Sequence, residues 1–325
     1  MTNPLVSVAM TTYNGEKYLK EQIDSILNQS YKNIELVICD DCSKDGTWNI
    51  LQEYASKDNR IKIVQNSSNL GFIRNFEQAI SLCAGDFIAL SDQDDIWEQW
   101  KIEESVKTIG NHDLLCSNSL LVDSNNNSLG HTLKDTLEFY SILDNQEILF
   151  KHLCFENFVQ GSTILAQAAF LQPIAKTSEN SLKIGYHDYW YAFKATEGNG
   201  IIYLDKCTIR YRQHEKQVTT NPVKSTFTEQ MLSCLKKGEV SNHLNWCNNH
   251  VQFQDILLSM PLSAERRQFV EETKKYFECM KNKNWYTFCF FVKYHDAIHL
   301  DKNILRKTLR ITKRLLGLMK YKILG

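Results

Sequence analysis

Three carboxylates within four residues, Asp92, Asp94 and Asp95, are the part of the sequence best suited to chemistry. They follow the apolar run 87–90, which predicts a buried strand whose carboxyl end opens into a polar crevice. Carboxylates this close repel one another, so a bound cation would stabilise the fold. Oxygen ligands favour Mg²⁺ or Mn²⁺, and Mg²⁺ usually also binds substrate phosphates. The structural alternative is a solvated acidic turn that caps a helix starting near Glu98.

The elements that must position this cluster alternate along the chain. Apolar, β-rich runs predict strands at 5–12, 34–39, 60–64 and 86–91, and helical periodicity predicts helices at 16–27, 47–54 and 71–82. This alternation predicts an α/β fold with a mostly parallel sheet and helices on both faces. Ligands of such sheets bind beyond the carboxyl ends of the strands, so the polar ends of three strands should converge on one site. These ends are residues 11–14, 40–41 and 92–95.

The second strand ends in the segment Cys-Asp-Asp-Cys at 39–42. A redox role is disfavoured because acidic neighbours raise thiol pKa values, and the second cysteine pair of a zinc site is absent. We expect Ser43 or Asp45 to cap the next helix. Asp40 and Asp41 are then free to face the crevice, where carboxylates can accept hydrogen bonds from a nucleobase and a ribose. Because the sequence contains neither a dinucleotide fingerprint nor a P-loop, a metal is the expected means of holding phosphates.

Beyond residue 122 the alternation stops. We predict strands at 113–122, 158–165, 201–204 and 207–211, a helix beginning near 185, and helical structure from about 226 onward. Gly161, within the second of these strands, indicates close backbone approach to a ligand.

Residues 303–325 form a basic tail. Leucines at helical spacing separate its cations, which predicts an amphipathic helix that can lie on an anionic membrane surface. The alternative is a helix docked on the protein with a solvated basic face. The basic residues are Arg306, Lys307, Arg310, Lys313, Arg314, Lys320 and Lys322.

Bulk composition narrows the class of protein. The chain of 325 residues has a net charge of −1, so no overall field would attract nucleic acid. Its ten cysteines are scattered in mostly apolar contexts, which favours reduced thiols in a cytosolic protein. We expect no signal peptide, because the N-terminus lacks a basic segment, and no membrane span, because the longest apolar run, 285–292, is too short.

Several motifs, taken in their order along the chain, resemble those of the inverting family 2 glycosyltransferases. The resemblance covers roughly residues 5–218. The motifs are Thr11-Thr12-Tyr13-Asn14-Gly15, Asp40-Asp41-x-Ser43-x-Asp45-Gly46-Thr47, Asn69-x-Gly71 with Asn75, and Ser91-Asp92-Gln93-Asp94-Asp95-Ile96-Trp97. The last motif is most similar to bacterial rhamnosyltransferases of surface polysaccharide assembly, as are His187-Asp188 and Tyr211-Arg212-Gln213-His214-Glu215. The Q-x-x-R-W motif of processive synthases is absent, which favours a single sugar addition.

The resemblance implies a GT-A, Rossmann-like fold with a mostly parallel central sheet flanked by helices, followed by a helical C-terminal region. The catalytic domain would be 1–218, with a nucleotide-sugar half at about 1–122 and an acceptor half at about 123–218, and 219–325 would form the helical region. The implied donor is a nucleoside diphosphate sugar, with dTDP-L-rhamnose favoured, and the implied acceptor is a lipid-linked glycan. The implied location is the inner face of the cell membrane, in the cytoplasm.

The resemblance also implies site residues. The nucleotide-binding residues would be Thr12, Asn14, Asp40, Asp41, Asn75 and Asp92. The ligands of Mg²⁺ or Mn²⁺ would be Asp92, Asp94 and His214, with Asp94 as the direct carboxylate ligand and Asp95 beside it.

Three further residues complete the implied site. Asp188, at a predicted helix start, is the candidate catalytic base, although a helix dipole would also favour a carboxylate there. His187 would contact the acceptor or simply pack, and we favour packing. Arg212 would pair with phosphate.

Three alternatives stay open. The donor could be UDP-glucose or UDP-galactose. A nucleotidyltransferase also pairs aspartates on Mg²⁺, but residues 11–15 lack the Gly-rich basic loop of that class. A non-catalytic sugar-nucleotide-binding protein could keep the same scaffold, and only an assay separates it from an enzyme.

Overall fold

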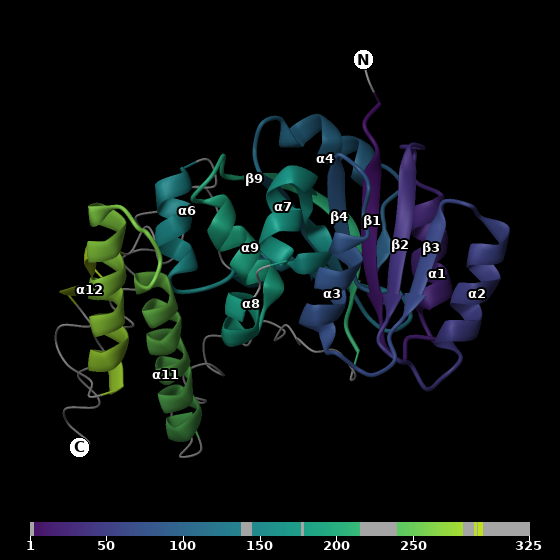
Figure 1. The fold of residues 1–325 in the computed structure, drawn as a ribbon. Coiled ribbons are helices and arrows are strands. Elements are labelled where there is room, and N and C mark those ends of the chain that lie inside the picture. The colour runs from purple at the N-terminus through teal and green to yellow at the C-terminus, as the bar shows by residue number, and fades with distance from the viewer. Residues whose placement is uncertain are drawn as a thin grey trace. The chain divides into compact units, whose positions relative to one another are not determined.

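The computed structural model describes residues 3–137, 145–176, 179–214, 239–281, 289–290 and 292–294. The chain forms two compact units (Figure 1). The first comprises Met1–Leu137 and Phe158–Asn221, and the second comprises Glu138–Asn157 and Pro222–Gly325. The short segment before Phe158 thus belongs to the same unit as the C-terminal helices, which the sequence pattern did not indicate.

The predicted α/β fold is confirmed in the first unit. Its sheet has the order β3-β2-β1-β4-β8-β6-β9-β5, and β7 pairs with β6. Every residue of β1 and β2 is buried, as expected for central parallel strands covered on both faces. The parallel strands at this end of the sheet are β1 (Val6–Thr12), β2 (Ile34–Asp40), β3 (Ile61–Gln65) and β4 (Phe87–Ser91).

The other half of the sheet is mixed. It contains β5 (Ile96–Trp97), β6 (Leu114–Val122), β7 (Ser128–Thr132), β8 (Leu165–Gln167) and β9 (Ile201–Arg212). The two strands predicted between 201 and 211 are one strand, β9, which pairs with β6 through register shifts near Asn118. β8 runs antiparallel to both β4 and β6.

The strand predicted at 158–165 is wrong. Residues Gly161–Thr163 form a 3₁₀ turn, η1, and β8 begins only at Leu165. The Thr163 hydroxyl and amide both donate to the Gln160 carbonyl, at 2.7 and 3.0 Å. Local hydrogen bonds of this kind compete with the hydrogen bonds between strands. The segment therefore forms a turn in place of the strand that its apolar residues predict.

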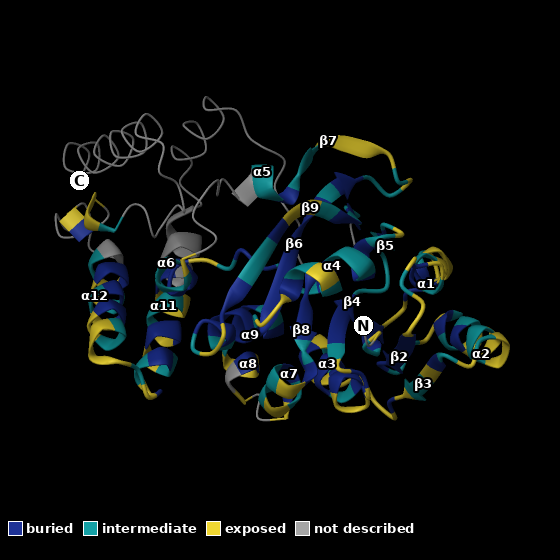
Figure 2. Ribbon diagram, turned by 90° about the horizontal axis from the view of Figure 1, so that it is seen from above, coloured by how far each residue is buried: buried dark blue, intermediate teal, exposed yellow. Residues whose placement is uncertain are grey.

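Helices cover both faces of the sheet, with α1 and α4 on one face and α3 and α7 on the other (Figure 2). The central strands are buried, while the outward sides of the helices are exposed. α1 begins later than predicted because the Gly15 and Glu16 amides donate to Thr47 and Asp45. The helices of this unit are α1 (Leu19–Leu27), α2 (Thr47–Lys57), α3 (Phe72–Ser81), α4 (Lys101–Ile109), α5 (Leu133–Leu137), α7 (Ala168–Ala175), α8 (Glu179–Ile184) and α9 (His187–Ala195).

The second unit is helical, with α6 (Gln146–Leu153), α11 (Glu239–Leu258) and α12 (Ala264–Lys281). Its core includes an aromatic cluster in which the Phe155 ring lies about 6 Å from four others, those of Phe269, Tyr276, Phe277 and Phe290. Among the described residues, no helix combines the length and apolarity that a membrane crossing requires. The basic tail, 303–325, lies outside the described residues.

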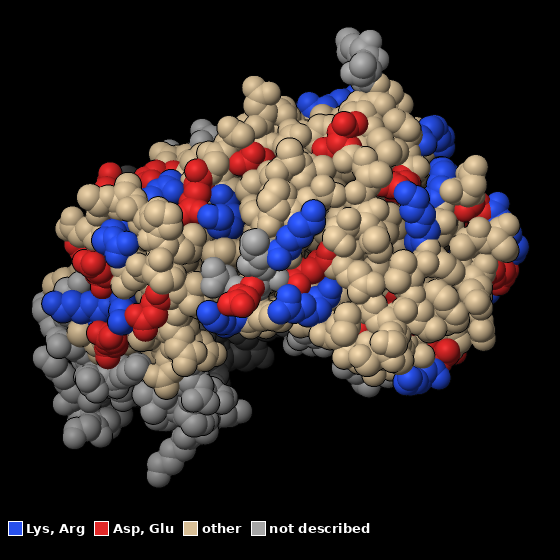
Figure 3. All heavy atoms as spheres, in the orientation of Figure 1, with Lys and Arg blue, Asp and Glu red and all other residues tan. Residues whose placement is uncertain are grey.

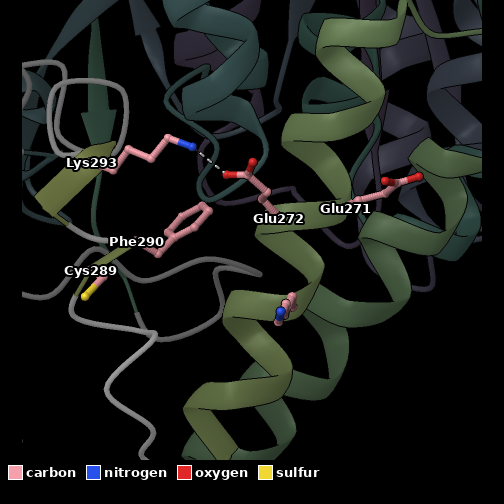
Figure 4. A pocket seen from close by; sticks show the side chains of 6 residues that line it. Glu271, Glu272, Cys289, Phe290 and Lys293 are labelled. Atoms are coloured by element: carbon pink, nitrogen blue, oxygen red, sulfur yellow. Dashed lines mark hydrogen bonds and ion pairs between the residues drawn. The ribbon is translucent and has the colours of Figure 1, made fainter.

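The second unit also has a cavity of about 470 Å³ (Figure 4). Its lining combines an aromatic ring with side chains of both charges, and Lys293 pairs with Glu272 at 3.0 Å. On the face shown in Figure 3, Lys and Arg side chains lie among Asp and Glu side chains. This mixture of signs agrees with the net charge of −1.

Candidate active site

Carboxylates from distant parts of the sequence meet at the carboxyl edge of β4. Asp92 and Asp94 follow β4 directly, and Asp188 lies in the first turn of α9. Burial, together with the charges of Asp94 and Asp188, raises the pKa of Asp92 to about 7. The charge of Asp188 thus reaches Asp92, although almost 100 residues separate the two in sequence. A like-charge cluster of this kind favours a bound cation.

His214 completes the acidic edge. Its Nε2 atom lies 2.8 Å from an Asp94 carboxylate oxygen, and 14% and 16% of the two side chains are exposed. The His214 ring also packs on Tyr18, with 5.1 Å between ring centroids. Within the described part of the chain, no three His, Cys, Asp or Glu side chains are grouped closely enough to form a metal site by themselves. Asp94 and His214 could therefore supply two ligands, leaving the remaining positions for water and substrate phosphates, as is usual for Mg²⁺.

Arg212 holds this region in place from inside the protein. Its side chain is only 2% exposed and pairs with Glu21 at 2.6 Å. The guanidinium also donates to the carbonyl oxygens of Asp94 and Ser124, at 2.9 and 3.0 Å, and lies over the Tyr18 ring. These contacts support a positioning role for Arg212, and its predicted pairing with phosphate stays a prediction.

Asp95 differs from its two neighbours in being completely buried. Burial, together with the charges of Asp94 and Asp92, raises the pKa of Asp95 well above its usual range, while the hydrogen bond that the Arg212 amide donates opposes this shift. The acidic loop therefore presents Asp92 and Asp94 toward its partly exposed side and turns Asp95 into the core.

The expectation that Asp40 faces an open crevice is wrong. Asp40 is fully buried at the end of β2, and its carboxylate accepts hydrogen bonds from Thr12 at 2.9 Å, from the Ser43 amide at 3.0 Å and from Gln65 at 3.0 Å. Thr12 is itself 1% exposed. Asp40 and Thr12 thus tie the ends of β1 and β2 together.

Asp41 is also buried, with 2% exposure, which again differs from the expected free carboxylate. It accepts hydrogen bonds from the amides of Leu70 and Gly71, at 2.7 and 2.9 Å, and from Asn66 at 3.0 Å. Asn75 extends this network by accepting from Asn66 at 2.9 Å and donating to the Cys39 carbonyl at 2.8 Å. Asp41 therefore shapes the loop before α3, and direct base contacts by Asp41 and Asn75 stay predictions.

Asn14 organises the loop after β1. It adopts a left-handed backbone conformation with φ of 49°, its amide donates to the Ser43 hydroxyl at 2.9 Å, and its side chain accepts from the Lys44 amide at 2.8 Å. These bonds connect the loops after β1 and β2, so the predicted strand ends do meet at one edge of the sheet.

Gln93 was missed by the sequence reasoning. Its side-chain amide accepts from the Tyr13 amide at 2.8 Å and donates to the Tyr13 carbonyl at 3.1 Å. A Cβ atom on Gly15 would lie 2.1 Å from the Gln93 oxygen, so Gly15 is required for this contact. Gln93 therefore ties the acidic loop to the loop after β1. The glycine directly after Tyr13-Asn14 was the available signal.

Asp188 and His187 begin α9 with different environments. Asp188 Oδ2 accepts from the Gly161 amide at 3.1 Å, and its side chain stays partly exposed. His187 is 5% exposed and packs on Phe76, with 4.4 Å between ring centroids. Burial lowers the pKa of His187 to about 3, so its ring is neutral at physiological pH.

Comparisons with known proteins agree with this geometry. Residues 7–165 match the family Glycosyl transferase family 2. This segment contains β1 to β4, the acidic loop and η1. Residues 7–165 are therefore similar to members of glycosyl transferase family 2.

Individual proteins resemble the chain over different lengths. It is 26% identical over 323 residues to an uncharacterized glycosyltransferase of Haemophilus influenzae, covering 96% of each chain. It is 35% identical over 130 residues to the UDP-Glc:alpha-D-GlcNAc-diphosphoundecaprenol beta-1,3-glucosyltransferase WfgD of Escherichia coli, covering 37% of this chain and 51% of WfgD.

A solved structure shares the fold. The mannosyltransferase PcManGT from Pyrobaculum calidifontis, in complex with GDP-Man and Mn²⁺, superposes with a TM-score of 0.54. The two chains are 14% identical, and the match covers 98% of this chain and 81% of that one. The likeness supports the glycosyltransferase fold of the protein.

Proposed function

We propose that the protein transfers a sugar, with inversion, from a nucleoside diphosphate sugar to a hydroxyl of a lipid-linked glycan in bacterial surface polysaccharide synthesis. The observation that carries the proposal is the contact of Asp94 with His214 beside Asp92, whose pKa the charges of Asp94 and Asp188 raise, in a segment that matches family 2. The name of WfgD, which specifies a UDP-sugar donor and a diphosphoundecaprenol-linked acceptor, supports both substrate classes.

A divalent cation fits this edge. Burial, together with the charges of Asp94 and Asp188, raises the pKa of Asp92, so a positive partner would stabilise its ionised form. An oxygen and a nitrogen ligand lie adjacent on Asp94 and His214. We propose that these two residues hold Mg²⁺ or Mn²⁺, with Asp92 beside them. The ion would neutralise the diphosphate as it leaves. The Mn²⁺ in the complex of PcManGT supports this choice.

Inversion requires only one base. Asp188 would take the proton of the acceptor hydroxyl as that oxygen bonds to the anomeric carbon, while the bond to the diphosphate breaks on the opposite face. The anomeric carbon would pass through an oxocarbenium-like state, as in glycoside hydrolysis. The structure supports this role because Asp188 is partly exposed and lies near Asp92.

Calorimetric titration with dTDP, UDP and GDP would test the donor half of the proposal. Each nucleotide is titrated with Mn²⁺, with Mg²⁺ and with a chelator. We expect metal-dependent binding with dTDP preferred, as the similarity to rhamnosyltransferases suggests. A preference for UDP would keep the site but transfer the donor to UDP-glucose or UDP-galactose, the former being named for WfgD. Absence of binding under every condition would contradict the proposed function.

We further propose that the protein acts in the cytoplasm at the inner face of the cell membrane, with its basic tail on anionic lipid. Deleting residues 303–325 is expected to release the protein from anionic liposomes, because the cations of the tail are then lost. Activity on a water-soluble acceptor should be retained. Flotation of the full-length and the shortened protein with anionic and neutral liposomes measures membrane binding. Undiminished binding of the shortened protein to anionic liposomes would refute the role of the tail.

A further inference from the structure

The side chain of Gln22 is a polar group on the otherwise apolar buried face of α1. Gln22 is completely buried, and the other buried residues of this helix are Leu19, Ile23 and Ile26. A buried primary amide loses its hydrogen bonds to water, and only hydrogen bonds within the protein compensate for that loss. A methionine of similar volume would fill the same space without this cost. The partners of the amide, rather than its volume, therefore explain a glutamine at this position.

These partners lie where β4 ends and the acidic loop, residues 92–95, begins. Nε2 of Gln22 donates to the Ser91 hydroxyl at 2.8 Å and to the Asp92 carbonyl at 3.2 Å. The Ser91 hydroxyl itself donates to the same carbonyl at 2.9 Å. Two donors thus fix the orientation of the peptide group that follows Asp92.

The other end of the acidic loop is held from the same helix. Oε1 of Gln22 accepts a hydrogen bond from the Ser25 hydroxyl at 3.0 Å, and Ser25 Oγ accepts one from the Trp97 amide, also at 3.0 Å. A chain of hydrogen bonds therefore runs from the Asp92 carbonyl through Gln22 and Ser25 to the Trp97 amide. Two side chains of α1 restrain the backbone on both sides of the acidic loop.

The acidic loop benefits from such a restraint because its charges repel one another. A single residue separates Asp92 from Asp94, and the charge of Asp188 also acts on Asp92. Without a cation, an unrestrained loop would relieve this repulsion by moving the carboxylates apart. A divalent cation would then have to draw them together again, and this rearrangement would reduce its affinity. Hydrogen bonds from a neutral amide hold the backbone without adding a charge.

We propose that Gln22 is a positioning residue, which holds the acidic loop in the conformation that binds a divalent cation before the cation arrives. This inference rests on the proposed function, in which Asp94 and His214 hold Mg²⁺ or Mn²⁺. Gln22 acts through the backbone of Asp92 and not as a ligand. Residues that orient metal ligands typically contribute 10–100-fold to metal affinity, so its removal should have an effect of this size.

The substitution Gln22→Met tests the inference, because it keeps the volume of the side chain and removes its hydrogen bonds. The full-length protein is titrated calorimetrically with dTDP and with UDP, in Mn²⁺ and in chelator. Affinity in Mn²⁺ should fall about 10–100-fold for the nucleotide that the wild type binds. Affinity in chelator should match that of the wild type, since the nucleotide contacts themselves are unchanged.

Gln29→Met is the matched control. Gln29 is also completely buried, and its side chain likewise forms hydrogen bonds with the backbone, to the Glu98 carbonyl at 2.8 Å and from the Ile102 amide at 3.1 Å. These partners lie beyond the acidic loop. Both substitutions should therefore lower the free energy of unfolding by similar amounts, as measured by urea denaturation in chelator. Only Gln22→Met should weaken the binding that depends on Mn²⁺.

Hydrogen exchange provides a measurement that needs neither metal nor nucleotide. In chelator, a peptide covering 92–97 should exchange faster in Gln22→Met than in the wild type or in Gln29→Met. Ser25→Ala interrupts the same chain of hydrogen bonds by a smaller change, and it decides the question if Gln22→Met does not fold. It should also exchange faster, because the Trp97 amide loses its acceptor, and should bind nucleotide in Mn²⁺ about fivefold more weakly, the value of one hydrogen bond.

The outcomes separate this inference from the proposed function. Wild-type affinity in Mn²⁺ for both Gln22→Met and Ser25→Ala, or unchanged exchange of 92–97 in both, would overturn the inference and leave the proposed function intact. Equal losses of affinity in Gln22→Met and Gln29→Met would also overturn it, because they indicate general destabilisation. If the wild type binds nucleotide equally well in Mn²⁺ and in chelator, the proposed metal site fails and the inference fails with it. If the wild type binds no nucleotide, the proposed function itself fails.

Discussion

The Asp188→Asn protein is expected to transfer sugar about 10²–10⁴-fold more slowly than the wild type, the usual contribution of a positioned general base. An amide cannot take the proton of the acceptor hydroxyl. It can still accept the Gly161 amide hydrogen bond that holds this side chain, so the start of α9 should keep its structure. Donor affinity should stay unchanged, because the loss falls on the chemical step.

The measurement is the single-turnover rate of product formation at saturating donor, with donor affinity determined by calorimetry in parallel. Glu103→Gln is the matched control, since Glu103 is also a carboxylate in the first turn of a helix, α4. It tests whether a favourable interaction with a helix dipole explains any loss. Near wild-type turnover of Asp188→Asn would remove Asp188 as the base. If the wild type also shows no transfer to any acceptor, the result would favour the alternative of a non-catalytic sugar-nucleotide-binding protein.

The Asp94→Asn protein should lose the increase in donor affinity that a divalent metal provides. Residues that only orient metal ligands contribute about 10–100-fold to metal affinity, so losing a charged ligand should cost on the order of 100-fold. The substitution also weakens the hydrogen bond between residue 94 and His214, which is 2.8 Å long in the wild-type protein. Affinity for the bare nucleoside, which does not contact the metal through phosphate, should change little.

Titration of nucleoside diphosphate with Mn²⁺ and with chelator measures this effect, and the chelator series is the internal control. Wild type and variant should coincide in chelator and differ in Mn²⁺. His214→Gln, which removes the other proposed ligand, should show a loss of the same kind. A metal-dependent increase in Asp94→Asn equal to that of the wild type would contradict the metal assignment.

Much of the fold could be predicted because it is encoded locally. Apolar runs ending in polar groups indicated β1, β2 and β4, and the helices between them follow from helical periodicity. The strand predicted at 158–165 failed because hydrogen bonds of Thr163 form a turn, which an apolar pattern does not reveal. The membership of 138–157 in the second unit depends on tertiary packing with helices about 100 residues away.

The site was less accessible to sequence reasoning. The proximity of Asp94 and His214, 120 residues apart, could be expected only from resemblance to a family. The burial of Asp41 depends on amides at positions 70 and 71, whose backbone donors have no sequence signature. Gln93 was missed for a similar reason, because its partner is the backbone of Tyr13 rather than a side chain.

The contact of Gln93 with Tyr13 has a consequence for how a donor is recognised. One side-chain amide joins the loop after β1 to the loop that carries Asp92 and Asp94, so two hydrogen bonds hold the two loops together. A donor whose base contacts one loop and whose diphosphate contacts the other would bind to loops that are already aligned with each other. The entropy cost of aligning the two loops is then met when the chain folds and not when the donor binds. The base and the diphosphate of one nucleotide should therefore bind more tightly together than the sum of their separate affinities.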